Sequence, residues 1–576
     1  MHTFKVWAPI PGKVEVQLGN EKFPMTAGPG SWWEATVPSA APGADYAFLL
    51  DGKGPFPDPR SPWQPAGVHG ASRLMDHSAF SWTDADFHAP QISTAIIYEL
   101  HTGTFTPEGT FVAAIEKLDH LRDLGVTHIE LMPVAAFSGK YGWGYDGVSM
   151  FAPHGSYGEP SELKRLVDAC HARGLAVLLD VVYNHLGPSG NYLPQYGPYF
   201  TSRYSTPWGS AVNYDDAESD GVRRFFCDNA LMWLRDYHFD GLRLDAVHAI
   251  FDNSAVPFLE QLAVEVTQLG DRLSRRLVLI AESDLNAPRV VLPPERGGYG
   301  LDAQWSDDFH HATHAILTGE TNGYYADFGS LAHLAKALRQ GFVRDGGYSI
   351  HRRCRLGRPP VGVPGDRFVV CLQNHDQIGN RAQGERTSQL MNLGRLKIGA
   401  ALVLTSPYVP LLFQGEEWGA RAPFLYFADH PEPDLARAVR EGRRREFAAF
   451  GWKPEDIPDP GSAESFQRSI LDWSELLREP HAELLKWHRQ LIRLRRAEPE
   501  LRPGALESVN VRFDERARWL VLERGRISVA CNFGSGPEVL PLRTRPQQTL
   551  LVSDPAAEIG PSAVTLGPDS VVILKH

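Results

Sequence analysis

The chain has 576 residues, of which 43% are hydrophobic and 22% charged, as in ordinary soluble globular proteins. Its formal net charge of −12 argues against a nucleic-acid partner, because binding phosphates requires a basic surface. A chain of this length exceeds one ordinary domain, so two to four domains are expected, with a large barrel counting as one.

The five cysteines are widely spaced, odd in number and form no Cys-x-x-Cys pair, so neither a disulfide framework nor a zinc site is expected. The first residues lack a charged segment followed by an apolar core. No uninterrupted apolar run approaches the ~20 residues that a membrane span needs. We therefore expect a cytoplasmic protein.

Residues 1–90 contain short alternating runs broken by Gly and Pro, which predicts an N-terminal β-sandwich. From about residue 93 the pattern changes to alternating strand and helix candidates. The strand candidate Ala95–Leu100 precedes apolar residues at helical spacing over 112–124, and Gly125 stands where a C-cap glycine belongs. A second helix is expected over 161–173. Repeated strand–helix units of this kind indicate a parallel sheet with helices outside.

Eight strand candidates between residues 93 and 415 favour a closed (β/α)₈ TIM barrel as the centre of a multidomain protein. The barrel domain should span 91–498, with an insertion over 319–364 and a last long helix over 481–496. Residues 499–576 read as a C-terminal antiparallel β domain. The candidate strands are Ala95–Leu100, Val126–Met132, Leu175–Val182, Gly241–Asp245, Leu277–Glu282, Leu301–Trp305, Phe368–Leu372 and Val409–Phe413.

Four of these strands end in carboxylates, histidines or an arginine, in the segments 180–185, 241–248, 279–284 and 371–380. In such barrels the reactive side chains lie at the C-terminal ends of the strands. A single Asp there is usually a helix cap or a turn residue. Four such endings together are costly to bury unless the groups are paired or used.

Glycoside hydrolysis with retention accounts for this cluster. It needs a nucleophilic carboxylate and an acid/base carboxyl about 5–5.5 Å apart, which Asp245 and Glu282 on neighbouring strands can supply. Arg243 lies on the same side of its strand as Asp245 and should keep that aspartate ionised. The acid needs a raised pKa to hold its proton. Asp376 can stabilise the oxocarbenium-like charge or hold the sugar ring.

The four segments resemble the four characteristic stretches of glycoside hydrolase family 13, the α-amylase family, and occur in the expected order. The resemblance covers the whole chain, because residues 1–90 resemble the module related to carbohydrate-binding module family 48 and residues 499–576 resemble the family's usual tail domain. It implies that Asp245 is the nucleophile, Glu282 the acid/base and Asp376 the stabiliser. It also implies substrate binding by Tyr145, Asp146, His185, Arg243, His248, Asp284, Asp307, Asp308, His310, His311, His375, Gln377, Asn380 and Arg381.

Within the family, the stretches 141–147, 305–311, 413–418 and 423–430 resemble members that cleave the α-1,4-glucosidic bond next to the terminal trehalose unit of maltooligosyltrehalose. This resemblance implies release of trehalose and a maltooligosaccharide, with maltooligosyltrehalose synthase as a pathway partner. One alternative is a glycogen branching enzyme or debranching α-glucan hydrolase on the same framework. Another is a non-catalytic glycan-binding protein, although such a binder has no need of three intact carboxylates.

Some members of the family bind calcium beside the third strand, where this chain has Asn184. The loop over 186–210 offers few carboxylates, and Asp215, Asp216 and Glu218 are expected to start a helix. Calcium prefers six to eight oxygen ligands, so we predict that no metal is bound. No cofactor is expected either, since no phosphate loop or dinucleotide fingerprint follows the first strand.

Overall fold

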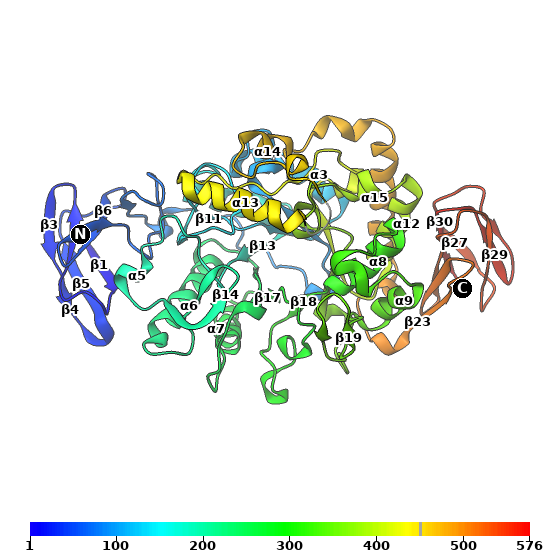
Figure 1. Ribbon diagram of the computed structural model, residues 1–576, viewed down its shortest axis with the longest axis horizontal. Coiled ribbons are helices and arrows are strands. Elements are labelled where there is room, and N and C mark those ends of the chain that lie inside the picture. Colours follow the sequence, from blue (N-terminus) through cyan, green and yellow to red (C-terminus); the bar gives the residue numbers. More distant parts are fainter. Residues whose placement is uncertain (449–451) are drawn as a thin grey trace.

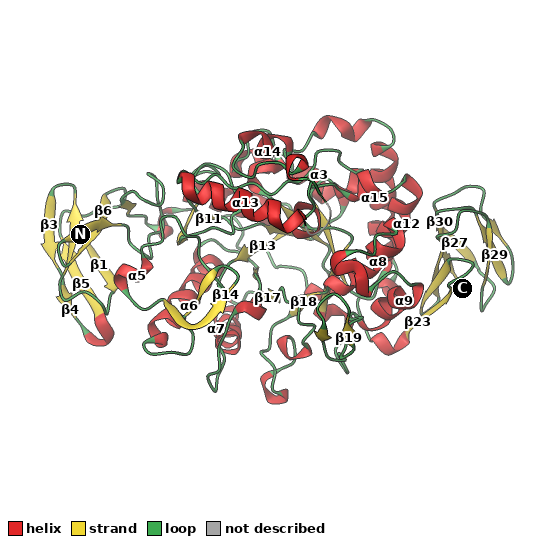
Figure 2. Ribbon diagram, in the orientation of Figure 1, coloured by secondary structure: helices red, strands yellow, loops and turns green. Residues whose placement is uncertain are grey.

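The computed structural model describes residues 1–448 and 452–576. It is elongated, with strand-rich regions at the two ends and a helix-rich region between them (Figures 1 and 2). The N-terminal strands and the C-terminal strands therefore lie far apart, on opposite sides of the central part. Within the described residues, no helix combines the length and the apolar character that crossing a membrane requires.

The N-terminal region consists of two antiparallel sheets, as a sandwich requires. One sheet has the order β1-β5-β4 and the other β3-β2-β6-β7, with β8 also paired to β6. The strands are β1 (His2–Trp7), β2 (Val14–Leu18), β3 (Glu21–Pro24), β4 (Thr26–Ala27), β5 (Trp32–Val37), β6 (Asp45–Leu50), β7 (Lys53–Phe56) and β8 (Ser72–Arg73). Their alternating apolar side chains, such as Val14, Val16 and Phe48, form the buried face. The sandwich contacts the central region through Arg60, which pairs with Asp228 at 2.8 Å.

The central region is a closed parallel barrel of eight strands, and each strand candidate from the sequence supplies one of them. The predicted barrel is therefore confirmed. Buried apolar side chains from the strands, among them Ile97, Leu178 and Ile280, fill the barrel interior. In barrel order the strands are β9 (Ile97–Leu100), β10 (His128–Leu131), β13 (Ala176–Val181), β16 (Gly241–Leu244), β17 (Val278–Ala281), β18 (Ala303–Trp305), β21 (Phe368–Cys371) and β22 (Val409–Phe413).

Helices surround the barrel, as the repeated strand–helix pattern predicts. The single helix expected over 112–124 is instead two helices, which Glu116 and Lys117 separate. Gly125 does end the second one, with a left-handed φ of 99°. The helices that follow barrel strands or cover them include α2 (Phe111–Ile115), α3 (Leu118–Leu124), α4 (Pro160–His171), α6 (Ser219–Asp236), α7 (Phe258–Leu273), α8 (Asp307–Thr318), α10 (His375–Gly379), α12 (Leu393–Thr405) and α15 (His481–Ala497).

Two segments outside the regular pattern border the C-terminal ends of the barrel strands. The insertion over 319–364 folds into α9 (Leu331–Gln340) and a hairpin of β19 (Tyr348–Ser349) and β20 (Cys354–Arg355). After β22, the helix α13 (Pro433–Ala448), which the sequence had not indicated, lies across the barrel in Figure 1. Smaller elements are α1 (Thr102–Phe105), α5 (Leu193–Tyr196), α11 (Thr387–Leu390), α14 (Ala463–Arg468), β11 (Ala135–Ala136), β12 (Ser149–Pro153), β14 (Phe200–Thr206) and β15 (Gly209–Val212).

The C-terminal region is antiparallel β-structure, as expected. It has a five-stranded sheet of order β23-β24-β25-β30-β27 and a three-stranded sheet of order β26-β29-β28. Arg524 anchors it to the barrel by donating to the carbonyls of Thr405 and Ser406, where α12 ends and cations are favoured. The domain boundaries near 90 and 498 stay predictions. The strands are β23 (Val509–Asp514), β24 (Trp519–Arg524), β25 (Ile527–Asn532), β26 (Glu538–Pro541), β27 (Gln548–Val552), β28 (Glu558–Ile559), β29 (Ala563–Leu566) and β30 (Ser570–Lys575).

Candidate active site

A cavity of about 420 Å³ opens where the barrel strands end. It brings together all three carboxylates singled out from the sequence, together with aromatic rings from the loops and from the segment after β22. Its lining residues are Trp143, Tyr145, Asp146, His185, Trp208, Asp245, Ala246, His248, Glu282, Asp284, His375, Asp376, Asn380, Tyr426, Phe427 and Arg443. A polar pocket walled by flat rings is the form expected of a sugar site.

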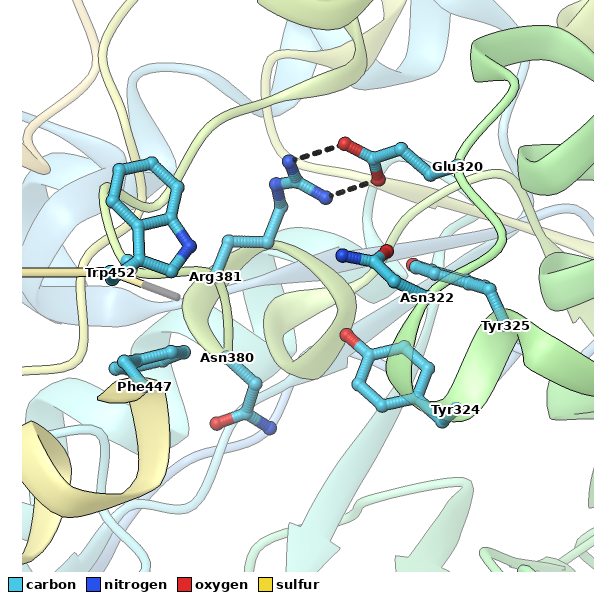
Figure 3. A pocket seen from close by; sticks show the side chains of 9 residues that line it. Glu320, Asn322, Tyr324, Tyr325, Asn380, Arg381, Phe447 and Trp452 are labelled. Carbon is cyan, nitrogen blue, oxygen red and sulfur yellow. Dashed lines mark hydrogen bonds and ion pairs between the residues drawn. The ribbon is translucent and has the colours of Figure 1, made fainter. Parts of the chain in front are cut away.

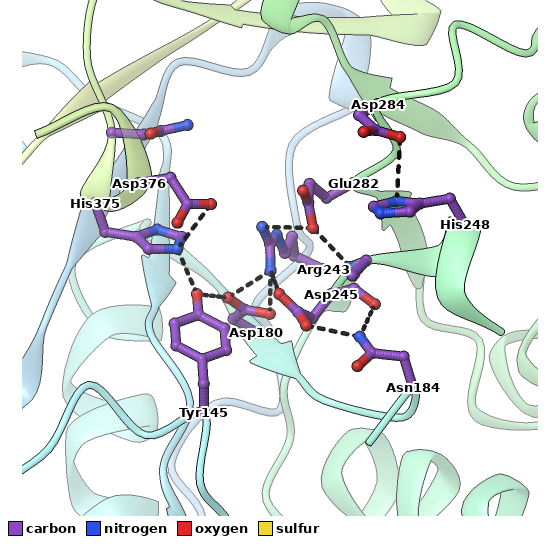
Figure 4. A network of polar contacts seen from close by, with 12 residues as sticks. Tyr145, Asp180, Asn184, Arg243, Asp245, His248, Glu282, Asp284, His375 and Asp376 are labelled. Atoms are coloured by element: carbon purple, nitrogen blue, oxygen red, sulfur yellow. Dashed lines mark hydrogen bonds and ion pairs between the residues drawn. The ribbon is translucent and has the colours of Figure 1, made fainter. Parts of the chain in front are cut away.

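Asp245 follows β16 and is held on both carboxylate oxygens (Figure 4). Arg243 donates to Oδ1 at 2.9 Å and Asn184 donates to Oδ2 at 2.7 Å. Arg243 thus lies beside Asp245 as the strand alternation predicts. Burial alone would raise the pKa of Asp245, but the charge of Arg243, helped by His185 and Asn184, holds it below its usual value. The group is ionised and its geometry is fixed.

Glu282 follows β17 and touches the same arginine, whose Nη2 lies 3.3 Å from Oε2. The same oxygen accepts a hydrogen bond of 2.6 Å from the backbone N–H of Ala246. Ala246 has a left-handed φ of 39°, a conformation that costs energy in a non-glycine residue and that here aims this N–H at the carboxyl. Burial, with the charges of Asp245 and Asp376, raises the pKa of Glu282 well above its usual value, against the pull of Arg243.

Asp376 lies at the start of α10, beyond β21, and is more exposed than the other two carboxylates. Its side chain is 37% exposed, against 11% for Asp245 and 14% for Glu282. Asn380 donates to its Oδ1 at 3.1 Å. Arg443, on α13, donates in turn to the side-chain oxygen of Asn380 at 3.1 Å. Helix α13 therefore supports the third carboxylate, a contact that nothing in the local sequence pattern had indicated.

A continuous polar network joins these groups beneath the pocket (Figure 4). The Tyr145 hydroxyl donates to Asp180 Oδ2 at 2.5 Å and contacts His375 Nε2 at 2.7 Å. Asp180 accepts from Arg243 on both oxygens at 2.9 Å. Asp180 is the first residue of the segment 180–185, and the sequence had suggested no role for it. The strand register could have indicated its role, because Asp180 on β13 lies directly beside Arg243 on β16.

His248 and Asp284 form a second group at the edge of the same cavity. Nδ1 of His248 lies 3.8 Å from Asp284 Oδ1, and Arg352 from the β19–β20 hairpin contacts Asp284 Oδ2 at 2.5 Å. On the side of His185, Trp208 stacks on the imidazole with ring centroids 4.5 Å apart. Trp208 is 49% exposed and had not been singled out from the sequence. His248 and Asp284 thus present polar side chains to the pocket, and His185 and Trp208 present flat rings.

The residues of the predicted binding stretch Asp307–His311 have different surroundings in the structure. Asp307 is close enough to Asp376 to feel its charge. Burial, together with that charge, raises the pKa of Asp307 to about 7. Within the described part of the chain, none of these five residues lines the cavity. Asp308 is fully buried and accepts from Arg344 and Asn286.

The two histidines of this stretch are likewise turned inward. His310 Nδ1 bonds the carbonyl of Leu372 at 2.8 Å, and His311 Nδ1 bonds that of Asp307 at 2.6 Å. Substrate binding by Asp308, His310 and His311 stays a prediction, and in the structure their side chains are buried and bonded to neighbouring groups. His310 thus reaches the residue that follows β21, whereas His311 bonds within its own helix α8, a difference that a linear motif does not reveal.

Arg381 lines a smaller cavity of about 150 Å³ next to the first (Figure 3). It forms a two-pronged ion pair with Glu320, at 2.8 and 3.0 Å. Asn380 lines both cavities. The backbone N–H of Gln377 donates to the side-chain oxygen of Asn374 at 2.9 Å. Arg381 thus belongs to a neighbouring wall and Gln377 to the turn that carries Asp376.

Asn184, at the position considered for calcium, bonds Asp245. Its amide nitrogen donates to the backbone carbonyl and to Oδ2 of Asp245, each at 2.7 Å, and its side-chain oxygen contacts His185. In the part of the chain that is described, no group of three or more His, Cys, Asp or Glu side chains is arranged to hold a metal ion. The absence of a metal stays a prediction.

We expect hydrolysis to continue at an unchanged rate after dialysis against a chelator, because hydrogen bonds from Asn184 and Arg243 already hold Asp245 in place. The measurement is the initial rate with and without added calcium. Loss of activity in chelator that calcium restores would contradict this prediction.

Sequence comparisons agree with the geometry. Residues 78–204 match the family model described as "Alpha amylase, catalytic domain", and residues 504–573 match "Domain of unknown function (DUF3459)". A malto-oligosyltrehalose trehalohydrolase of Rhizobium sp. (strain M-11) is 50% identical over 99% of this chain and 97% of its own length. One of Mycobacterium tuberculosis (strain ATCC 25618 / H37Rv) is 48% identical over 100% of this chain and 99% of its own.

Among solved structures, a putative alpha amylase from Salmonella typhimurium has 40% identity and a TM-score of 0.92, covering 100% of this chain and 97% of its own. A pullulanase from Anoxybacillus sp. LM18-11 has a TM-score of 0.74 at 20% identity, over 100% of this chain and 86% of its own, and shows the fold alone. The chain is an α-amylase-type glycoside hydrolase with a closed eight-stranded barrel. More narrowly, the chain belongs to the malto-oligosyltrehalose trehalohydrolase family.

Proposed function

We propose that the protein hydrolyses the α-1,4-glucosidic bond next to the terminal trehalose unit of maltooligosyltrehalose and retains the α configuration. The observation that carries the chemistry is the shared contact of Asp245 and Glu282 with Arg243. One guanidinium thereby holds an ionised nucleophile beside a carboxyl that keeps its proton, the pair that a double displacement needs.

In the first step, the carboxylate of Asp245 attacks the anomeric carbon while the bond from that carbon to the leaving oxygen breaks. Glu282 gives its proton to that oxygen, so trehalose leaves as a neutral alcohol and the maltooligosyl unit stays on Asp245 as an ester. Positive charge develops on the sugar ring between the two bonds. Asp376 on the open side of the cavity, together with the ionised Asp245, stabilises that charge.

In the second step, Glu282 is a carboxylate and takes a proton from water, whose oxygen attacks the anomeric carbon of the ester. The bond to Asp245 breaks, the maltooligosaccharide leaves with α configuration, and Glu282 holds its proton again.

Activity should fall at acidic pH as Asp245 is protonated through its lowered pKa. At alkaline pH it should fall as Glu282 loses its proton through its raised pKa.

The substrate class follows from the close relatives, which are named for trehalose release and share nearly the full length of the chain. A maltooligosyltrehalose synthase is the proposed partner in the pathway, since some enzyme must form the trehalose end. A cytoplasmic location stays a prediction.

The test of the proposed function is to compare kcat/KM for maltooligosyltrehalose with that for a plain maltooligosaccharide and amylose. Equal values, or transfer of glucan chains instead of hydrolysis, would favour the debranching or branching alternative.

Selectivity for trehalose-ended chains is assigned to His248 and Asp284, at the cavity edge beyond Glu282. Asp284, which Arg352 holds, and His248 beside it present polar groups where the leaving sugar would lie. A pocket that hydrogen-bonds one arrangement of hydroxyls rejects another, because its polar groups are then left unpaired at about 1–3 kcal/mol each.

We therefore expect Asp284→Ala to lower kcat/KM more for maltooligosyltrehalose than for a plain maltooligosaccharide, by about tenfold or more. The matched control is Asp119→Ala on the outer helix α3, where the carboxylate is 57% exposed and forms surface ion pairs. It should change neither value. An equal loss on both substrates would show that Asp284 only orients Glu282.

A further inference from the structure

Two glutamates that the proposed mechanism does not use lie side by side in the barrel interior, beneath the cavity. Glu99 on β9 and Glu130 on β10 are direct neighbours in the parallel register. Glu99 is 1% exposed and Glu130 is 0% exposed. Carboxyl groups this deeply buried are costly unless they have a partner or a task.

Glu99 has such a partner in His375, the residue before Asp376. Its Oε1 lies 2.5 Å from His375 Nδ1, and its Oε2 accepts a hydrogen bond of 3.1 Å from the backbone N–H of His375. One carboxylate therefore fixes both the imidazole ring and the first residue of α10. The other ring nitrogen, Nε2, faces Tyr145 at 2.7 Å and Asp376 Oδ2 at 3.5 Å.

The hydrogen-bond directions determine where the protons of this ring lie. The single hydroxyl proton of Tyr145 is donated to Asp180, so the phenolic oxygen must accept at its contact with His375 Nε2. On the other side, the Glu99 carboxylate accepts the backbone N–H of His375 with one oxygen, and its other oxygen faces Nδ1 as an acceptor. Both ring nitrogens then carry a proton and the ring is an imidazolium.

The charges around the ring support this state. Burial alone would lower the pKa of His375, but the carboxylates of Asp376 and Glu99 raise it to about 9, against the opposing charge of Arg243. The titratable and charged groups acting on or contacting the ring are Glu99, His101, Glu130, Tyr145, Asp180, Arg243 and Asp376.

Glu130 differs from Glu99 in having no partner. Within the described residues, neither of its carboxyl oxygens has a hydrogen bond. Burial and the neighbouring Glu99 raise the pKa of Glu130 well above its usual value, so it is neutral. The hydrogen bonds of this adjacent pair to His375 are therefore made by Glu99.

We propose that Glu99 is a positioning residue that keeps His375 doubly protonated, so that Nε2 is a fixed donor toward Tyr145, Asp376 and the bound sugar. The sugar contact rests on the proposed function, whereas the protonation of the ring is a property of the free protein. A neutral ring would be free to carry its one proton on Nδ1 and would then present a lone pair to the pocket.

Proton–carbon NMR of protein labelled with [¹³Cε1]histidine tests the proposal directly. The His375 signal is assigned by its disappearance in His375→Gln and is followed as the pH is raised. We expect a pKa above about 8 in the wild type, and a fall of at least about one pH unit in Glu99→Gln. Glu130→Gln is the matched control, because it replaces a neutral acid by a neutral amide on the adjacent strand and should leave the titration unchanged.

The wild-type titration decides the matter even if Glu99→Gln fails to fold, since a His375 pKa near or below about 6.5 would overturn the proposal. Equal shifts in Glu99→Gln and Glu130→Gln would also overturn it. For activity, we expect kcat/KM to fall about 10–100-fold in Glu99→Gln, with partial recovery in Glu99→Asp. Failure of the wild type to release trehalose would contradict the proposed function and leave the titration result standing.

Discussion

Asp245→Asn is expected to lower kcat by at least about 1,000-fold while the protein stays folded, because the amide cannot form the glycosyl ester on which a double displacement depends. The side chain is held by Arg243 and Asn184 at 2.9 and 2.7 Å, and the amide has the same shape. Substrate should therefore still bind. The measurement is kcat for maltooligosyltrehalose, with circular dichroism and thermal unfolding as checks of the fold.

The matched control is Asp146→Asn, which changes another carboxylate that lines the same cavity but lies near His430, at 3.7 Å, and away from Arg243. It should alter KM more than kcat. Retention of more than about a tenth of the wild-type kcat in Asp245→Asn would remove Asp245 from the role of nucleophile.

Glu282→Gln is expected to lose about 10²–10⁴-fold in kcat on maltooligosyltrehalose, since a sugar alcohol leaves poorly without a proton. The loss in the first step should be much smaller with α-glucosyl fluoride, because fluoride needs no proton to leave. The second step still lacks its base, so the glycosyl ester should accumulate. We expect a burst of fluoride equal to the enzyme concentration, followed by slow turnover.

Azide supplies an anionic nucleophile that requires no base, and it should restore turnover of the fluoride substrate by Glu282→Gln. The fall in activity at alkaline pH that arises from the raised pKa of Glu282 should also disappear from the burst rate of this variant. Equal losses on both substrates, with no burst and no effect of azide, would show that Glu282 is not the acid/base.

The eight barrel strands could be predicted because each is a short, mostly apolar run, as strands buried on both faces are, and four of them end in polar residues. The same endings located Asp245, Glu282 and Asp376, since parallel strands of a barrel bring their C-terminal ends to one face. The relation of Arg243 to Asp245 followed from strand alternation alone.

Other parts of the site depend on contacts between segments distant in the chain. Arg443 reaches Asn380 only because α13 crosses the barrel, and a charged helix carries no sign of where it will dock. Glu99 meets His375 because the first and seventh barrel strands end at the same face, although the residues are 276 positions apart. For Asp308 the motif was recognised, but the direction of the side chain on α8 was not.

The most direct test of the account is proton NMR of maltooligosyltrehalose during the first minutes of reaction with the wild-type protein. We predict that trehalose appears together with a maltooligosaccharide whose new reducing end is first α and reaches the anomeric equilibrium only later. A first-formed β-anomer would contradict the double displacement through Asp245. Formation of glucose or maltose from the chain without trehalose would contradict the proposed specificity.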